Sequence, residues 1–126
     1  MERTDNTLPT KLILIVCVAA LLATAAIAYF AFERLPHLED EVAYLFQART
    51  LALGRLTVPS PEHPEAFWTP FVLDYQGERF GKYPPGWPAV LALGVAARAA
   101  WLVNPLLAAI ALYPVSYTHL PLPTKR

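Results

Sequence analysis

The sequence predicts an all-α membrane protein with two to three transmembrane helices and one long polar loop. Three observations lead to this fold class. Of the 126 residues, 56% are hydrophobic and 16% are charged, whereas soluble domains carry about 25% charged residues. The segment 12–32 has no charged residue, proline or glycine, and all 13 prolines lie outside 10–35. So many apolar side chains require burial, which excludes a disordered chain.

Charge and cysteine content argue against two further classes of protein. Ten basic and ten acidic residues cancel and no basic stripe is present, so nucleic acid is not an expected partner. One cysteine, Cys17, cannot form a disulfide scaffold. Its place in the longest apolar segment predicts a buried, inert thiol.

The first predicted element is a transmembrane helix over 12–32, preceded by a cytoplasmic tail, 1–11. Its 21 residues would span about 30 Å, which matches the hydrocarbon core of a bilayer. Tyr29, Phe30 and Phe32 place aromatic rings at its far end, as in an interfacial belt. The alternative is a cleaved signal peptide. An anchor is favoured because the apolar segment exceeds the usual signal core and the leader contains acidic residues.

A long polar loop follows over 33–86, with eight acidic and five basic residues. Apolar side chains at spacings of three and four predict a helix over 40–53 that lies along the membrane interface. The main positions of this stripe are Val42, Leu45, Phe46, Arg49 and Leu53. Acidic residues favour the helix start, and Gly54 ends it.

The rest of the loop is rich in proline and turn residues. The segment 59–64 contains three prolines and is expected to be irregular. Segments 71–75 and 79–82 flank a turn at 76–78, which predicts a short hairpin.

Two further apolar segments predict transmembrane helix 2 at 87–97 and the start of transmembrane helix 3 at 102–114. A turn is expected near Arg98, because an unpaired charge at the bilayer centre costs at least about 2.5 kcal/mol. The final segment, 115–126, fits no membrane helix. It resembles translated adapter sequence, so an artefactual tail on a truncated fragment is expected.

Two groups of residues suggest chemistry. Glu39, Asp40 and Glu41 offer a carboxylate as general base at the start of a rigid helix, although such runs are usually solvated helix caps. Arg79 and Lys82 stand just before an apolar helix, where the phosphate of a membrane lipid would lie. Ordinary snorkelling of cations at the membrane surface is the alternative interpretation.

In combination these features resemble one family, the polyprenyl-phosphate-dependent membrane glycosyltransferases of the GT-C fold. The family includes protein O-mannosyltransferases and the aminoarabinose transferases that modify lipid A. The best-matching stretches are 38–49, with its Asp-Glu pair, and 81–86, with its Lys-Tyr-Pro-Pro-Gly sequence. The resemblance covers about 12–114 and implies a truncated GT-C fold with the loop 33–86 outside the cell membrane.

The resemblance also implies roles for individual residues. Asp40 matches an active-site acid, with Glu41 as the second member of the catalytic pair. Lys82 matches a lysine that contacts the lipid phosphate, and Arg79 falls where aminoarabinose transferases have a tyrosine near that phosphate. Those enzymes have an arginine at the position of Ala43, so the sequence departs from aminoarabinose specificity.

The implied function is transfer of a sugar from a lipid-linked donor to a hydroxyl of a glycan, lipid or protein. The protein would be a multi-pass component of the bacterial cytoplasmic membrane, and the fragment alone would be inactive. The alternative is a non-catalytic membrane protein, such as a transporter or assembly subunit. No cofactor is evident, although some relatives on this fold use divalent cations.

Two other groups of residues in the loop are candidates for binding. Glu62, His63 and Glu65 lie close in sequence, but the surrounding prolines prevent helical ligand spacing, so no metal site is predicted. Four aromatic residues are candidates either for stacking on sugar or for dipping into the membrane. They are Phe67, Trp68, Phe71 and Tyr75.

Overall fold

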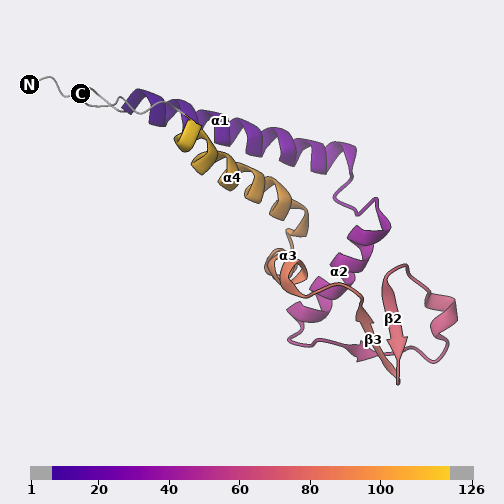
Figure 1. Ribbon diagram of the computed structural model, residues 1–126. Helices are drawn as coiled ribbons and strands as arrows, with labels where there is room; N and C mark the ends of the chain where they lie inside the picture. The colour runs from indigo at the N-terminus through magenta and orange to yellow at the C-terminus, as the bar shows by residue number, and fades with distance from the viewer. Residues whose placement is uncertain (1–6, 120–126) are drawn as a thin grey trace, which may run out of the picture.

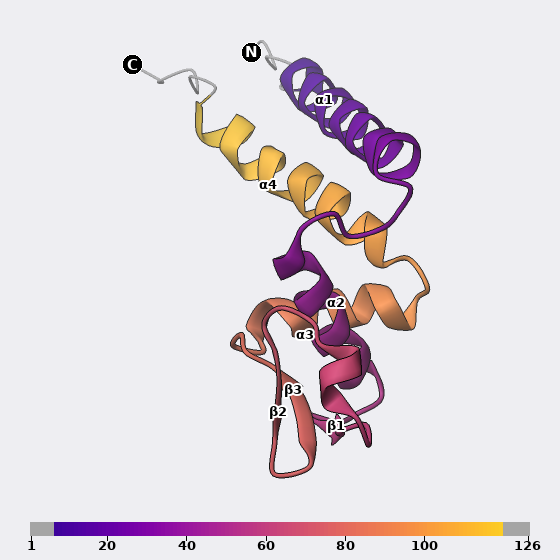
Figure 2. The same cartoon turned by 90° about the vertical axis from the view of Figure 1, so that its right-hand side faces the viewer.

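The computed structural model describes residues 7–119, which are mostly helical (Figure 1). Helices α1 (Thr7–Ala26) and α4 (Val103–His119) lie side by side and antiparallel, and we call this pair the helical hairpin. The chain between them forms helices α2 and α3 and a small sheet, which we call the loop module. The loop module lies at one end of the helical hairpin (Figures 1 and 2).

Helix α1 continues directly into a π-helix, η1 (Ile27–Ala31). The 22 residues Thr10–Ala31 extend about 33 Å. Within residues 7–119 this is the one helix that is long and apolar enough to cross a membrane. Cys17 is buried, as predicted, and Ile13 four residues earlier is buried with it. The two share the helix face that α4 covers.

Helix α2 (Glu39–Ala52) coincides closely with the predicted interfacial helix 40–53. Gly54 follows its end in a left-handed conformation, with φ of 72°, as in many helix C-termini. The predicted apolar stripe remains largely outside the protein core, since Leu53 is 72% exposed. The face buried against α3 and the sheet carries small or polar side chains instead. They are Ala43, Gln47, Ala48 and Thr50.

The predicted hairpin is present as β2 (Val72–Tyr75) and β3 (Glu78–Gly81). The strands are antiparallel, with Tyr75 opposite Glu78. Gln76 and Gly77 between them have φ values of 50° and 81°. Two consecutive residues with positive φ match the right-handed twist of a tight two-residue turn.

A third strand, β1 (Val58–Pro59), pairs with β3 and gives the sheet order β1-β3-β2. The prediction of an irregular segment at 59–64 is therefore wrong at its start. Proline is tolerated at position 59 because β1 is an edge strand, and the side on which Pro59 lacks its N–H faces away from β3. A short 3₁₀ helix, η2 (Pro64–Phe67), follows. With three strands in the loop module, an all-α description is too narrow.

Helix α3 (Gly86–Ala96) occupies most of the segment expected to form transmembrane helix 2, 87–97. Its 11 residues extend about 16 Å, roughly half the hydrocarbon thickness of a bilayer. It packs on α2 across the end of the helical hairpin (Figure 2). It therefore does not carry the chain to the opposite end of α1.

The predicted turn at Arg98 is present, and Arg98 has a φ of 57°. The 3₁₀ helix η3 (Ala100–Leu102) follows, and the ring of Trp101 lies 5.7 Å from that of Tyr29 at the end of α1. The turn is consequently at the same end of the helical hairpin as the loop module. The sequence interpretation had placed it at the opposite end.

Helix α4 passes through Pro114 and continues to His119. The expectation that the helix ends at 114 and is not continued by 115–126 is therefore wrong for 115–119. A proline inside a helix loses one backbone hydrogen bond, but apolar helices near membranes tolerate it. The remaining tail, 120–126, and residues 1–6 lie outside the described residues.

Candidate functional site

The candidate site forms where the first turn of α2 meets the chain leaving β3. Asp40 is the second residue of α2, and its side chain is exposed. The hydroxyl of Tyr83, two residues after β3, donates a hydrogen bond of 2.5 Å to Oδ1 of Asp40. The fold therefore joins the two stretches whose combination suggested the family, the Asp-Glu pair and the Lys-Tyr-Pro-Pro-Gly sequence.

Tyr83 is contacted at three points by three residues of α2. Asp40 accepts from its hydroxyl, the ring of Tyr44 lies 4.7 Å from its ring, and Nε2 of Gln47 donates to its carbonyl oxygen over 2.9 Å. Residues spaced by four and then three share one face of a helix. Gln47 is only 8% exposed, so its amide anchors this end of β3 to the helix that carries Asp40.

Lys82 lies next to this pair. Its Nζ is 4.9 Å from the centre of the Phe71 ring and 5.8 Å from that of Tyr83. Its backbone N–H donates to the carbonyl of Phe71 over 2.8 Å. Phe71 has a φ of 62°, which is rare for a bulky residue and marks local backbone strain. The strained turn places an aromatic ring beneath the ammonium group, which is exposed.

The hydrogen bond from Tyr83 to Asp40 raises the pKa of Tyr83 to about 12, with burial and the negative charge of Asp40 adding to the effect. The phenol therefore stays protonated at neutral pH and remains a donor. Within the described part of the chain, Oδ2 of Asp40 has no hydrogen-bond partner. A carboxylate with one oxygen fixed and the other open can accept a proton from a bound hydroxyl.

Comparison of the chain with protein-family models, with curated proteins and with solved structures gives no match in any of the three. The candidate site is therefore defined by its geometry. Asp40 and Lys82, predicted from separate stretches of sequence, both lie next to Tyr83, one at its hydroxyl and the other 5.8 Å from its ring centre. Glu41 and Arg79 do not join them.

Glu41 has a structural contact that the sequence interpretation did not foresee. Its Oε2 accepts hydrogen bonds from the backbone N–H groups of His37 (2.8 Å) and Leu38 (3.3 Å). Leu38 precedes the helix and has no side-chain oxygen to cap it. Glu41 instead reaches back to the exposed N–H groups at the start of α2, as the glutamate of a capping box does.

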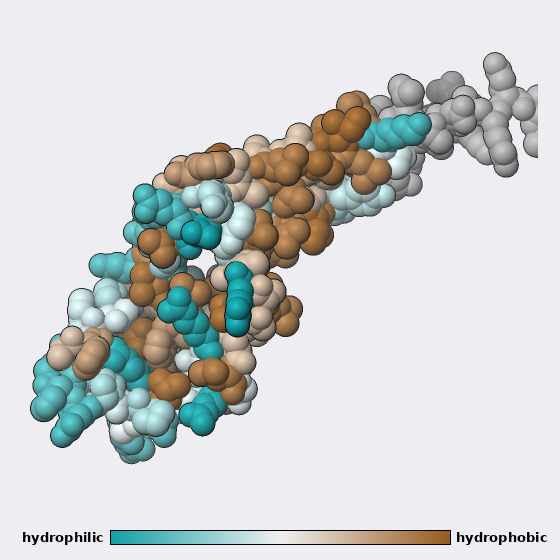
Figure 3. Space-filling model, turned by 180° about the vertical axis from the view of Figure 1, so that it is seen from behind, coloured by the Kyte–Doolittle hydropathy of each residue, from teal (hydrophilic) through white to brown (hydrophobic). Residues whose placement is uncertain are grey.

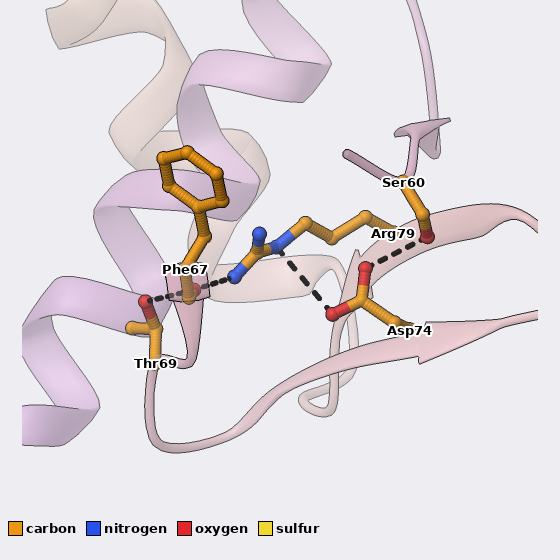
Figure 4. Close-up of polar contacts among 5 residues, drawn as sticks. All are labelled: Ser60, Phe67, Thr69, Asp74 and Arg79. Carbon is orange, nitrogen blue, oxygen red and sulfur yellow. Dashed lines mark hydrogen bonds and ion pairs between the residues drawn. The ribbon is translucent and has the colours of Figure 1, made fainter. Parts of the chain in front are cut away.

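Arg79 lies within the sheet, in a network drawn in Figure 4. It is 8% exposed. Its Nη2 donates to the carbonyl oxygen of Phe67, and its Nε lies 3.8 Å from Oδ2 of Asp74. Ser60 donates to the other oxygen of Asp74 over 2.7 Å. Reaching a lipid phosphate would require Arg79 to leave these contacts, so the structure gives it a role in holding the sheet.

The remaining candidates from the loop are exposed. Nδ1 of His63 lies 3.5 Å from Oε1 of Glu65 on the surface. No group of three or more His, Cys, Asp or Glu side chains within residues 7–119 is arranged to hold a metal ion. Phe67, Trp68 and Tyr75 are exposed, whereas Phe71 is packed beside Tyr83 and Lys82.

Sequence reasoning missed the roles of Tyr83, Tyr44 and Gln47. Asp40, Tyr44 and Gln47 are spaced by four and then three residues, which places them on one face of the helix. This spacing is visible in the sequence, but the interpretation of the helix used its apolar stripe instead. Their partner Tyr83, just after β3, was not identifiable from spacing, because it is more than 30 residues away.

Proposed function

We propose that this chain is part of a membrane glycosyltransferase of the GT-C type, which transfers a sugar from a polyprenyl-phosphate donor to a hydroxyl acceptor. The observation that carries the proposal is the meeting of Asp40 and Lys82 around Tyr83. Such a transfer requires a group that accepts the proton of the acceptor and a cation that stabilises the leaving phosphate. The resemblance in sequence supplies the chemical class of the donor.

The fold supports a location at a membrane surface. Thr10–Ala31 is long enough to cross a membrane, and the candidate site follows it closely in sequence and in space. We place α4 as a second crossing and the loop module on the extracytoplasmic side of a bacterial cytoplasmic membrane. This topology returns the chain to the side from which α1 began.

The proposed reaction is an inverting displacement. The acceptor oxygen attacks the anomeric carbon, forming a new carbon–oxygen bond as the bond to the lipid phosphate breaks. The acceptor proton passes to Oδ2 of Asp40, and the electron pair of the broken bond remains on the phosphate. Lys82 stabilises the charge that grows on this leaving group. The hydroxyl of Tyr83 fixes the orientation of the carboxylate without taking part in proton transfer.

The test is sugar transfer by the membrane protein that contains this segment, reconstituted with a labelled polyprenyl-phosphate hexose and a membrane extract as acceptor source. Asp40→Asn keeps the shape of the side chain but removes the base. We expect transfer to fall about 10²- to 10⁴-fold, the range for loss of a general base. Full activity of Asp40→Asn would contradict the assignment.

Two further variants separate the roles. Glu62→Gln is the matched control, because Glu62 is an exposed acid with no hydrogen bond or ion pair among residues 7–119. It should retain normal transfer. Lys82→Gln should lower transfer about 10²-fold or more through loss of phosphate stabilisation. Absence of transfer from every polyprenyl-linked donor would instead favour the alternative of a non-catalytic membrane protein.

A further inference from the structure

A cleft of about 630 Å³ opens where the helical hairpin meets the loop module. Its wall is mainly apolar and is built from η1, α2, α3 and the start of α4. Its apolar lining residues include Ile27, Phe32, Leu45, Trp87, Leu91 and Trp101. Figure 3 shows the surface hollowed at this junction, with the apolar surface of the helical hairpin beside it. Asp40 does not line this cleft. Tyr44 lines it and also packs against Tyr83 in the candidate site.

Aromatic rings place the cleft at the depth of a membrane surface. Tyr29 and Trp101 pack edge to face at the end of α1, and Trp87 lines the cleft nearby. Tyrosine and tryptophan gather at the boundary between hydrocarbon and water. The cleft is therefore open to the outer part of the bilayer.

The wall formed by α1 has an unusual backbone. Ile27 begins the π-helix, and beyond its end the N–H of Arg34 donates to the carbonyl of Ala28 over 2.9 Å, as in the capping of a helix C-terminus. Both Ile27 and Ala28 line the cleft. The π-helical turn therefore forms the end of the first helix beside the cleft.

Arg34 stands at the mouth of the cleft with an exposed guanidinium group. Its charge lies 4.9 Å from the centre of the Tyr29 ring. Among the residues that the structure describes, no carboxylate forms an ion pair with it. Glu41 also lines the cleft, but its carboxylate accepts hydrogen bonds from the two backbone N–H groups that begin α2. The mouth therefore presents a cation that is available to an anion.

The geometry points to a binding site for a phospholipid of the bilayer, with one acyl chain in the cleft and the phosphate on Arg34. A thin, flexible chain enters from the bilayer without crossing water, and its atoms restore the van der Waals contacts that an empty apolar cleft lacks. Guanidinium groups bind phosphate oxygens with two parallel hydrogen bonds. This site rests on the membrane placement proposed above, but it does not depend on the proposed sugar transfer.

Two other occupants fit less well. Water finds few polar partners on an apolar wall and does not fill such spaces stably. A helix, about 10 Å across with its side chains, would neutralise Arg34 only if it carried an acidic side chain at the mouth. A helix from another protein segment remains a distinct outcome of the test below.

The experiment uses the three tryptophans of the chain, Trp68, Trp87 and Trp101. The protein is reconstituted with a phospholipid brominated on its acyl chains and then extracted into mild detergent. Bromine quenches tryptophan fluorescence on contact. In a variant with Trp101 as the sole tryptophan, we expect quenching to persist after extraction because the lipid stays bound. A variant with only the exposed Trp68 should recover its fluorescence.

Two substitutions test the site itself. Ala108→Phe fills the cleft from α4, so it should restore the fluorescence of Trp101 after extraction. If that variant does not fold, Ala28→Leu fills the cleft from η1. Arg34→Gln should reduce retained phosphate about fivefold, while Arg55→Gln, an exposed arginine outside the cleft, should not. Recovery of Trp101 to the level of Trp68 in the unmodified protein, or a helix cross-linked in the cleft, would overturn the proposal.

Discussion

Removing the carboxylate of Asp40 should restore an ordinary titration of the Tyr83 phenol. In the folded protein the hydrogen bond to Asp40 raises the pKa of Tyr83 to about 12, against an ordinary value of about 10. Asp40→Ala removes both the acceptor and the negative charge. We expect the pKa of Tyr83 to return to within about one unit of 10, because only burial and nearby Tyr44 still oppose ionisation.

The same shift predicts how stability depends on pH. The folded state holds the phenolic proton more tightly than the unfolded chain does. The contribution to stability is therefore complete below pH 10, the unfolded value, and is lost as pH rises through the folded value of about 12. Thermal unfolding in detergent should show this loss in the unmodified protein. The Asp40→Ala variant should show less of it.

The titration is measured by nuclear magnetic resonance with ¹³C-labelled tyrosine. The chain has six tyrosines, so Tyr83→Phe identifies the signal that belongs to Tyr83. Glu39→Ala is the control, because it removes a neighbouring acid that makes no contact with Tyr83. A Tyr83 pKa near 10 in the unmodified protein, or one that Asp40→Ala leaves unchanged, would refute the geometry of the site.

Three destabilising substitutions and one control test the packing of the loop module by thermal unfolding in one detergent. Gly94→Ala forces a methyl group to within 3.0 Å of the backbone of the following turn, so it should cost about 1–3 kcal/mol. In Gly81→Ala the new methyl group meets the buried amide oxygen of Gln47 at 2.7 Å, so this substitution should cost a similar amount. Gly86→Ala is the control: its methyl group meets nothing within 4 Å, and it should not destabilise the protein. Asp74→Asn weakens the contact with Arg79 and should cost about 1–3 kcal/mol of folding stability. An unchanged melting temperature would contradict this prediction.

The elements that local sequence signals specify were predictable. Helix α2 is marked by its acidic start and by Gly54 after its end. The hairpin is marked by the Gln-Gly pair between two short segments that each contain apolar or aromatic residues. A charge between two apolar segments predicted the turn at Arg98. In each case the deciding interactions lie within a few residues of one another.

The arrangement of these elements was not predictable in the same way. The segment 87–97 has the composition of a membrane helix, yet it lies across the end of the helical hairpin because its apolar face packs on α2. Strand β1 depends on pairing with β3, some 20 residues away. Composition alone does not distinguish burial in lipid from burial against another helix, since both favour apolar side chains.

Strand geometry explains why Arg79 and Lys82 do not act together. The sequence interpretation assigned both cations to one phosphate because they are three residues apart. In an extended chain, side chains alternate between two faces, so positions separated by three point in opposite directions. Arg79 accordingly turns into the sheet toward Asp74, while Lys82 lies over the rings of Phe71 and Tyr83. The described part of the candidate site thus holds one cation, and a transferase built on it needs any second phosphate ligand from elsewhere in the protein.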